Sequence, residues 1–223
     1  MDLVLKQMLN KINNLPFINE KNAFYLLLAM HIAGVVGLSL EQTQDLFKAL
    51  VPFNLLATAA ILLHFEKNKN TNYGLFILIT FLVGFFVEVL GVKTGDVFGV
   101  YSYGSTLGFK IFDVPLAIGL NWVVLIYCTA HLSRKITKSV VVQVIIASLF
   151  MVAFDLLIEP VAINFDFWSW ELINIPIRNY IGWFVVSLLL QTLFHFLMKP
   201  TNNSLAIRLL YIQVGFFLVL NFI

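Results

Sequence analysis

Charged residues are scarce in this chain. Of its 223 residues only 12% are Asp, Glu, Lys or Arg, while 60% are hydrophobic and the mean hydropathy is +0.91. An ordinary soluble domain has about 25% charged and about 45–50% apolar residues, so this composition excludes a water-soluble globule. The net charge of +2 is too small to indicate a nucleic-acid partner.

Cysteine is almost absent, and the histidines are few. Cys128 is the single cysteine, which excludes an internal disulfide framework and a CxxC redox or zinc site. The four histidines form none of the HxxxH or HxxHH clusters that a membrane di-iron site needs, so we expect no metal site. The last apolar run contains Arg208 but no lysine, which excludes a retinal Schiff base.

Long apolar runs take up most of the chain. A membrane-spanning helix needs about 20 mostly apolar residues. Seven runs approach this length, at 22–40, 47–65, 73–92, 113–132, 138–158, 179–198 and 205–222. The sequence therefore predicts an all-α, polytopic membrane bundle of about seven transmembrane helices. We expect one integral membrane domain over residues 1–223, with the helix bundle at 21–223.

The first 20 residues have a different pattern. Apolar side chains recur at helical spacing from Leu5 to Leu15, polar residues lie between them, and Pro16 ends the pattern. An interfacial amphipathic helix fits this segment, and a loosely ordered polar segment is the alternative. We do not favour a cleaved signal peptide, because the first long apolar run begins only near residue 22.

Basic and acidic residues are distributed in opposite ways across the predicted bundle. Ten of the 14 Lys and Arg residues lie on the side of the N-terminal segment, so the positive-inside rule places the N-terminus in the cytoplasm and the protein in the cell membrane. Nine of the 12 carboxylates lie on the opposite side, which we call the acidic face. Because acids contribute little to topology, this asymmetry draws attention to the connections 93–112 and 159–178.

Glu88 lies inside the third apolar run. A charge at the centre of a membrane helix costs about 2.5–3.5 kcal/mol on insertion scales, so such residues are usually functional or paired. We favour a functional role for Glu88. The alternatives are an ion pair with Lys93 or Arg178, or a side chain that reaches the nearby interface.

Asp155 and Glu159 are four residues apart, which places both on one face of a helix. Like charges at this spacing favour sharing a proton. We expect both residues to lie in the last turn before Pro160, where the negative end of the helix dipole also favours the protonated form. A carboxylic acid that stays protonated is what general acid catalysis requires. We favour a functional role for Asp155, whereas Glu159 has either a functional role or an ion pair with Arg178.

The other acids of this face have simpler interpretations. Asp113 precedes Val114 and Pro115, so we expect it to cap the fourth span. Asp96 lies in a glycine-rich turn, where aspartate is common for conformational reasons. We expect Asp166 and Glu171, in the next long connection, to be solvated.

Aromatic side chains gather on the same face. The segment 94–103 alternates aromatic and turn residues, which suits a re-entrant or capping segment over a cavity. Trp168, Trp170, Tyr180 and Trp183 form either an interfacial aromatic belt or a wall that stabilises a cation. Inside the spans, we expect His31 and Asn54 to form hydrogen bonds between helices.

Several strings of residues occur in an order and spacing that can be compared with a known family. They are Pro52–Leu56, Glu88–Gly95, Phe98–Tyr103, Leu107 with Gly108, Val114–Leu116, Trp122, Asp155–Ala162, Trp168–Trp170 and Asn179–Phe184. Together they resemble the carotenoid biosynthesis family of membrane proteins, which includes the CruF-type carotenoid hydratases and the bisanhydrobacterioruberin hydratases. The resemblance runs from the second span to the sixth. The sequence departs from the family pattern at Glu159, where the family has an aspartate, and at Asp96 and Asp113, where it has uncharged residues.

The resemblance implies addition of water to the terminal isopropylidene double bond of an acyclic carotenoid end. This chemistry needs an acid, a group that orients water and electron-rich walls, but no redox cofactor. Our hypothesis makes Asp155 the proton donor, Glu88 the base that orients water and Glu159 the residue that tunes Asp155, with the donor and base roles exchangeable. We expect the substrate to contact Asn54, Tyr101, Tyr103, Trp122, Trp168, Trp170, Asn179 and Trp183. The expected partners are the carotenoid and membrane lipid.

Two alternatives remain open at this point. A carotenoid end-group cyclase begins with the same protonation but lets an internal double bond capture the cation. A transporter or a non-catalytic carotenoid-binding protein is the alternative from another class. Transport is the less favoured of these because the acids lie at one edge of the membrane and no inverted repeat is visible.

Overall fold

Seven helices form the bundle in residues 19–172, 174–201 and 203–223, the parts of the chain that this computed structural model describes. They are α2 (Glu20–Ser39), α3 (Gln44–His64), α4 (Thr71–Thr94), α5 (Leu116–Ile136), α6 (Val140–Asn164), α7 (Ile177–Leu197) and α8 (Ser204–Leu220). Helices α2 to α7 have 20–25 residues and are long and apolar enough to cross a membrane, whereas α8 has 17 and is at the lower limit. The all-α bundle is confirmed, while the predicted interfacial helix falls on residues 1–18, outside the described residues.

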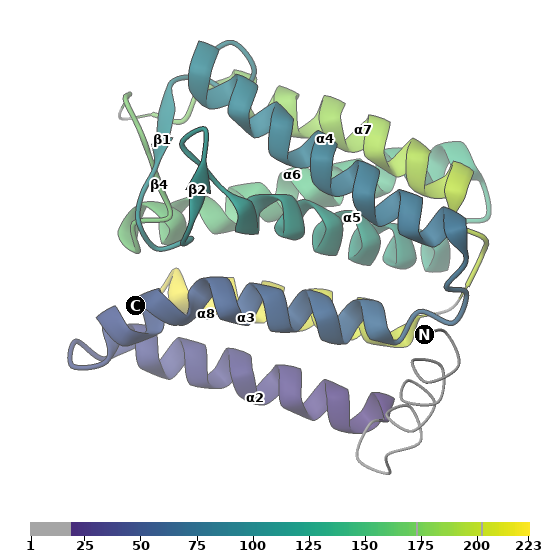
Figure 1. Cartoon of the computed structure of the whole chain (residues 1–223), viewed down its shortest axis with the longest axis horizontal. Coiled ribbons are helices and arrows are strands. Elements are labelled where there is room, and N and C mark those ends of the chain that lie inside the picture. Colours follow the sequence, from purple (N-terminus) through teal and green to yellow (C-terminus); the bar gives the residue numbers. More distant parts are fainter. Residues whose placement is uncertain (1–18, 173, 202) are drawn as a thin grey trace, which may run out of the picture.

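Helix α5 lies at the centre of the bundle. It packs against α3, α4, α6, α7 and α8, and Figure 1 shows α2, α3 and α8 together on one side of it. Its side chains are buried in an almost unbroken run from Ala117 to His131. Because protein rather than lipid surrounds this helix, it accommodates polar side chains such as Thr129 and Ser133.

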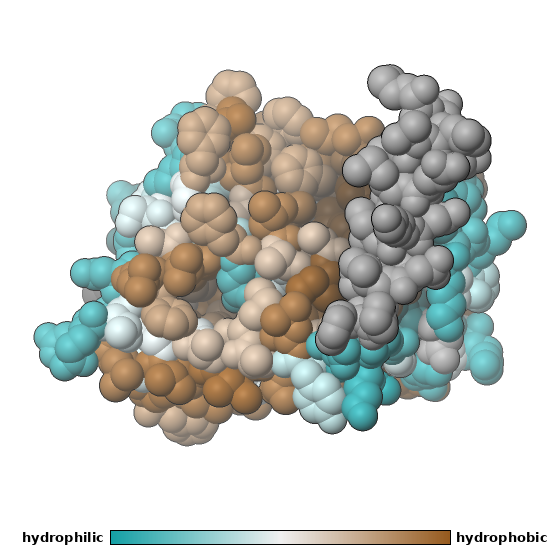
Figure 2. Space-filling view, turned by 60° about the horizontal axis from the view of Figure 1, so that its bottom comes forward, coloured by the Kyte–Doolittle hydropathy of each residue, from teal (hydrophilic) through white to brown (hydrophobic). Residues whose placement is uncertain are grey.

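The outer helices expose large apolar side chains, as contact with lipid requires. Leu78, Leu156 and Leu189 are each more than half exposed, on α4, α6 and α7. Figure 2, with the α2 side turned forward, shows a broad hydrophobic surface with hydrophilic residues toward its two ends. This arrangement is that of a bundle whose middle faces the hydrocarbon core.

Helix α6 continues past Pro160 and ends at Asn164. The prediction that Asp155 and Glu159 lie in its last turn is therefore wrong, since Glu159 is five residues, or about 7.5 Å, from the helix end. A proline removes one backbone hydrogen bond from a helix interior. Buried Ile158, Val161 and Ala162 pack α6 against its neighbours on both sides of the proline, which maintains the helix despite this loss.

In the described residues of the two long connections there are four short strands, at the end of the bundle that also holds the C-terminus (left in Figure 1). Strand β1 (Tyr101–Tyr103) pairs with β4 (Trp168–Trp170), and β2 (Lys110–Ile111) pairs with β3 (Val114–Pro115), both antiparallel. The acidic face is therefore covered by two small sheets.

Asp113 is a turn residue of the β2–β3 hairpin. It and Phe112 have positive φ angles of 68° and 54°, as a two-residue type I′ turn requires. The prediction that Asp113 caps the fourth span is wrong, because α5 begins at Leu116 with Pro115 as its N-cap. Asp113 instead forms an ion pair with Lys93 at 2.5 Å, which lowers the pKa of this exposed carboxyl.

The opposite end of the bundle closes around Glu66, which is 4% exposed. The Tyr127 hydroxyl donates a hydrogen bond to Glu66 Oε2 (2.5 Å), the Thr201 hydroxyl donates to the same oxygen (3.2 Å), and the backbone N–H of Asn68 donates to Oε1 (2.8 Å). These bonds tie the α3–α4 and α7–α8 connections to the central helix. We assign Glu66 a structural role.

Candidate active site

The two connections of the acidic face meet as one two-stranded sheet over the bundle. In β1 and β4, Tyr101 lies opposite Trp170, Ser102 opposite Ser169, and Tyr103 opposite Trp168. Because side chains alternate along a strand, the two serines are exposed and the four aromatic side chains face the helices. We call β1 with β4 the aromatic sheet. The polar edges of its rings are hydrogen-bond donors to the carboxyl groups below.

Asp166 fixes one end of the aromatic sheet. Its carboxylate accepts hydrogen bonds from the backbone N–H and the hydroxyl of Ser105, both at 2.8 Å, and these bonds lower the pKa of Asp166. A Cβ at Gly104 would overlap the backbone and side chain of Asp166, so only glycine fits there. Asp166 was predicted to be solvated, and it is exposed. It also anchors the aromatic sheet through its hydrogen bonds to Ser105.

Glu88 is 3% exposed and points into the bundle from α4. The hydroxyls of Tyr101 and Tyr103 donate hydrogen bonds to its Oε2 at 2.5 and 2.7 Å, and Trp122 Nε1–H donates to its Oε1 at 3.1 Å. An ionised carboxylate can only accept hydrogen bonds, so three converging donors suit the charged form of Glu88.

None of the three ion pairs considered for the buried acids is found in the described part of the chain. Lys93 binds Asp113, and Arg178 donates to the backbone carbonyl of Gly95 at 3.1 Å. Glu88 is also six residues, about 9 Å, from the end of α4, which is deeper than a side chain reaching the interface would be. The structural alternatives for Glu88 and Glu159 are therefore not supported by their contacts.

Asp155 and Glu159 project from α6 and share one partner, Asn179 of α7. They are 1% and 2% exposed. Asn179 Nδ2–H donates to Asp155 Oδ2 at 2.6 Å and lies 3.4 Å from Glu159 Oε1. The indoles of Trp168 and Trp170 donate to Glu159 Oε2 at 3.0 and 2.9 Å. Asp155 Oδ1 is buried with no hydrogen-bond partner in the described structure, which makes it the natural position for a proton.

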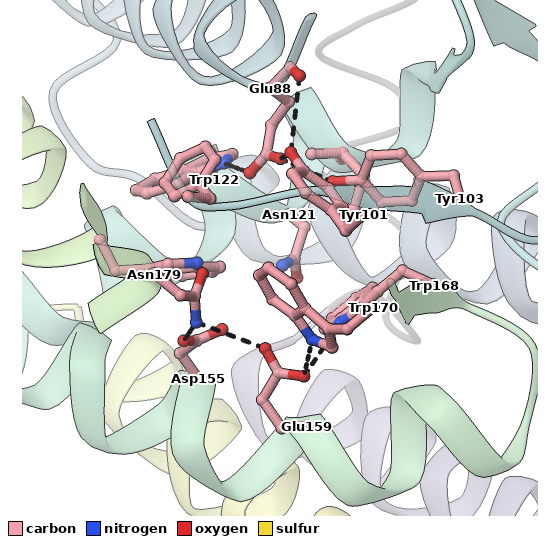
Figure 3. A pocket seen from close by; sticks show the side chains of 13 residues that line it. Glu88, Tyr101, Tyr103, Asn121, Trp122, Asp155, Glu159, Trp168, Trp170 and Asn179 are labelled. Carbon is pink, nitrogen blue, oxygen red and sulfur yellow. Dashed lines mark hydrogen bonds between the residues drawn. The ribbon is translucent and has the colours of Figure 1, made fainter. Parts of the chain in front are cut away.

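A small cavity separates these acids, and we call it the carboxylate chamber. Figure 3 shows Glu88 on one side of it and Asp155 with Glu159 on the other, with aromatic rings between them. Its volume is about 20 Å³, enough for one water molecule. Trp122 and Trp183 stack with ring centroids 4.5 Å apart and line one wall. The chamber thus combines acids, room for water and electron-rich rings.

A second cavity of about 70 Å³ adjoins the first, and we call it the inner chamber. The two share Ile118, Asn121 and Trp168 as lining residues. The inner chamber is otherwise mainly apolar, with Asn54 and His31 on its outer side. His31 Nδ1 bonds to the Leu27 carbonyl of its own helix (2.8 Å), and Asn54 Oδ1 has no partner in the described part of the chain, so the predicted interhelical hydrogen bonds are not found.

The structure brings together most of the residues chosen from sequence. Ten of the eleven candidates line the carboxylate chamber, and the other, Asn54, lines the inner chamber. Sequence reasoning missed Phe98, Ile118 and Asn121. Asn121 had a usable signal, a polar side chain within an apolar span. Among the described residues, no three His, Cys, Asp or Glu side chains lie together as metal ligands would.

Fold and site define a polytopic membrane protein with an enclosed, aromatic-walled carboxylate chamber. Residues 48–223 match the model of the carotenoid biosynthesis protein family, and the chain belongs to this family. It is similar to the bisanhydrobacterioruberin hydratase of Haloarcula japonica, with 27% identity over 136 residues. The match covers 55% of this chain and 45% of the relative, so it spans less than half of that protein. No solved structure matches the chain.

Proposed function

We propose that this chain adds water to the terminal isopropylidene double bond of an acyclic carotenoid end and so forms a tertiary alcohol. The observation that carries the proposal is the carboxylate chamber, where three buried acids surround room for one water behind aromatic rings. The family and the name of the similar hydratase support the same chemistry.

Asp155 supplies the proton. Its Oδ1 has no hydrogen-bond partner, while Asn179 holds Oδ2 in place, so a proton on Oδ1 points to no competing acceptor in the described structure. The π electrons of the double bond take this proton at the less substituted carbon. A C–H bond forms, the other carbon becomes a tertiary cation, and Asp155 becomes a carboxylate. Glu159, held by two indoles and near Asn179, positions Asp155 and tunes its acidity.

The walls of the chamber stabilise the cation. A cation over an aromatic face gains about 2 kcal/mol when both are removed from water. Trp122, Trp168, Trp170 and Trp183 all line the chamber, and the Glu88 carboxylate adds a negative charge. These groups are fixed before the reaction begins, which is the condition for effective electrostatic catalysis.

Glu88 receives the proton of the attacking water. The water oxygen bonds to the cation, and the proton it releases goes to Glu88 on the opposite side of the chamber from Asp155 (Figure 3). Transfer of this proton back to Asp155 through the next water resets the site. The sum is one water consumed, with H on one carbon and OH on its neighbour. Asp155 and Glu88 can exchange the roles of proton donor and base, and the net reaction is still the addition of one water.

Expression in cells that accumulate lycopene tests the proposal. We expect pigment heavier by one or two waters in liquid chromatography with mass spectrometry, and the added oxygen should come from oxygen-18 water. An isomer of unchanged mass would identify a cyclase. Unaltered pigment, with the protein in the membrane and a monocyclic carotenoid also unchanged, would favour the binding or transport alternatives.

Asp155→Asn is the variant that tests Asp155 as the proton donor. It keeps the size of the side chain and removes the proton donor, so we expect no detectable hydration while the protein remains in the membrane. Asp96→Asn is the control, because Asp96 is exposed on the same face and makes no contact with the chamber. Full activity of Asp155→Asn would overturn the donor assignment.

A further inference from the structure

The inner chamber continues outward into a lipid-facing groove between α2 and α3. This groove has a volume of about 370 Å³ and shares Val51, Asn54 and Phe216 with the inner chamber. The remaining residues of the groove are apolar or glycine and belong to α2 and α3. Figure 2 shows the face that carries α2 as an uneven apolar surface in which hydrophilic atoms are visible between hydrophobic side chains. Two cavities and one groove therefore adjoin one another in a series, separated by the side chains that they share.

The members of this series lie at similar depths in the bundle. Counting residues to the end of each helix on the acidic face gives about 9 Å for Glu88, about 14 Å for Asp155 and about 15 Å for Asn54. Because the depths are similar, the passage from the groove to the acids is roughly parallel to the membrane plane. The groove opens where hydrocarbon surrounds the helices, and the aromatic sheet lies on the aqueous side.

Phe216 stands where the groove meets the inner chamber. It lines both, and its ring lies edge-on to His31 with centroids 5.5 Å apart. Small residues leave room for it on α2, since a Cβ at Gly34 would lie 3.0 Å from Phe216 Cε2. The orientation of this one side chain therefore sets how closely the groove and the inner chamber approach each other.

Two of the buried polar atoms without hydrogen-bond partners in the described residues lie on this route. Asn54 Oδ1 and Gln213 Oε1 are buried, line the inner chamber and have no hydrogen-bond partner in the described structure. Unpaired polar groups within a membrane bundle are costly and are characteristic of substrate pathways. A helix interface that served only for packing would have apolar side chains at these positions, so the two polar residues support a substrate passage here.

We infer that the groove between α2 and α3 is the lateral entrance through which the linear isoprenoid chain of the substrate passes from lipid, past Phe216, to the carboxylate chamber. This inference rests on the proposed function. The reacting double bond lies where the inner chamber meets the carboxylate chamber, beside Asn121 and Trp168, and the rest of the isoprenoid chain lies in the inner chamber and the groove, between helices and lipid. A wider groove of about 660 Å³ between α2 and α8 reaches the inner chamber only at His31 and Phe216, so it is the poorer entrance.

Cysteine variants modified after folding test the entrance. Ala57→Cys places a thiol in the α2/α3 groove, Gly215→Cys places one in the α2/α8 groove, and Leu82→Cys places one on the exposed face of α4. The native Cys128 is fully buried and does not compete. Each purified variant is assayed for carotenoid hydration before and after reaction with a bulky hydrophobic maleimide. Because the maleimide is added to protein that is already folded and active, misfolding of a variant cannot account for a loss of rate.

We expect modification of Ala57→Cys to lower the hydration rate at least tenfold and modification of the other two to change it less than twofold. If the unmodified variants hydrate the carotenoid and only Gly215→Cys is blocked, or none is, the entrance is wrong while the proposed function stands. If no unmodified protein hydrates any substrate, the proposed function itself fails.

Discussion

At the scale of single residues, the chamber depends on phenols that remain hydrogen-bond donors. Burial and the neighbouring Glu88 carboxyl raise the pKa of Tyr101 and of Tyr103 above the ordinary value. A raised pKa keeps a phenol neutral to higher pH, so both hydroxyls still donate to Glu88 in alkaline solution. We therefore expect no loss of rate from tyrosine ionisation up to about pH 10, the ordinary pKa of tyrosine.

Tyr103→Phe removes one of the three donors to Glu88 without changing the ring. A hydrogen bond to a charged group is worth about 1.5–3 kcal/mol, which corresponds to a loss of rate of about 10- to 100-fold if it stabilises the working form of Glu88. Initial rates of pigment hydration measure the change, and exposed Ser102→Ala of the same strand is the control. An unchanged rate for Tyr103→Phe would show that this hydrogen bond does not stabilise the working form of Glu88.

Glu159→Gln separates a positioning role from a catalytic one. Glutamine keeps an oxygen for the indoles of Trp168 and Trp170 but removes the charge beside Asp155. We expect a residual rate with an altered pH profile, in contrast to the complete loss in Asp155→Asn. Complete loss in both variants, with normal folding, would instead make Glu159 a proton donor.

At the scale of elements, the aromatic sheet is a fixed cover. Ser102 and Ser169 lie directly opposite each other, with their hydroxyl oxygens 3.4 Å apart on the exposed side of β1 and β4. A Ser102→Cys and Ser169→Cys pair is therefore expected to form a disulfide. Because the substrate enters from lipid, we expect the oxidised protein to retain at least half of its hydration rate.

The same protein assayed with and without reductant gives the comparison, and mass spectrometry after alkylation gives the extent of oxidation. Each single cysteine variant serves as its control. A rate that falls on oxidation and returns on reduction would show that the two strands must part during turnover.

At the scale of the whole molecule, the unequal distribution of basic residues predicts which end of the bundle faces the cytoplasm. Asp96→Cys lies at the acidic face and Lys138→Cys at the opposite end, and both positions are exposed. In intact cells we expect a membrane-impermeant thiol reagent to label Asp96→Cys only, with Lys138→Cys labelled after lysis. Labelling of Lys138→Cys alone in intact cells would show that the bundle has the opposite orientation in the membrane.

Sequence alone predicts those features of this fold that depend on local pattern. Apolar runs predict the helices, and the cost of a charge in lipid selects Glu88 and Asp155. Contacts between distant segments were not predictable. Strands β1 and β4 have three residues each and are about 65 residues apart, and no local pattern encodes their pairing. The position of Asp113 in a turn likewise depends on the pairing of the two-residue strands β2 and β3, which the sequence pattern does not show.

The depth and direction of the carboxylate chamber have a consequence for substrates with two reactive ends. The described helices place Glu88 and Asp155 about 9–14 Å from the end of the bundle at the acidic face, so one end of a long, rigid polyene is held there while the other end lies far away. The molecule must leave, reverse and return before its second end reacts. Processing is then distributive: in a time course, the singly hydrated product should accumulate first and decline as the doubly hydrated product rises.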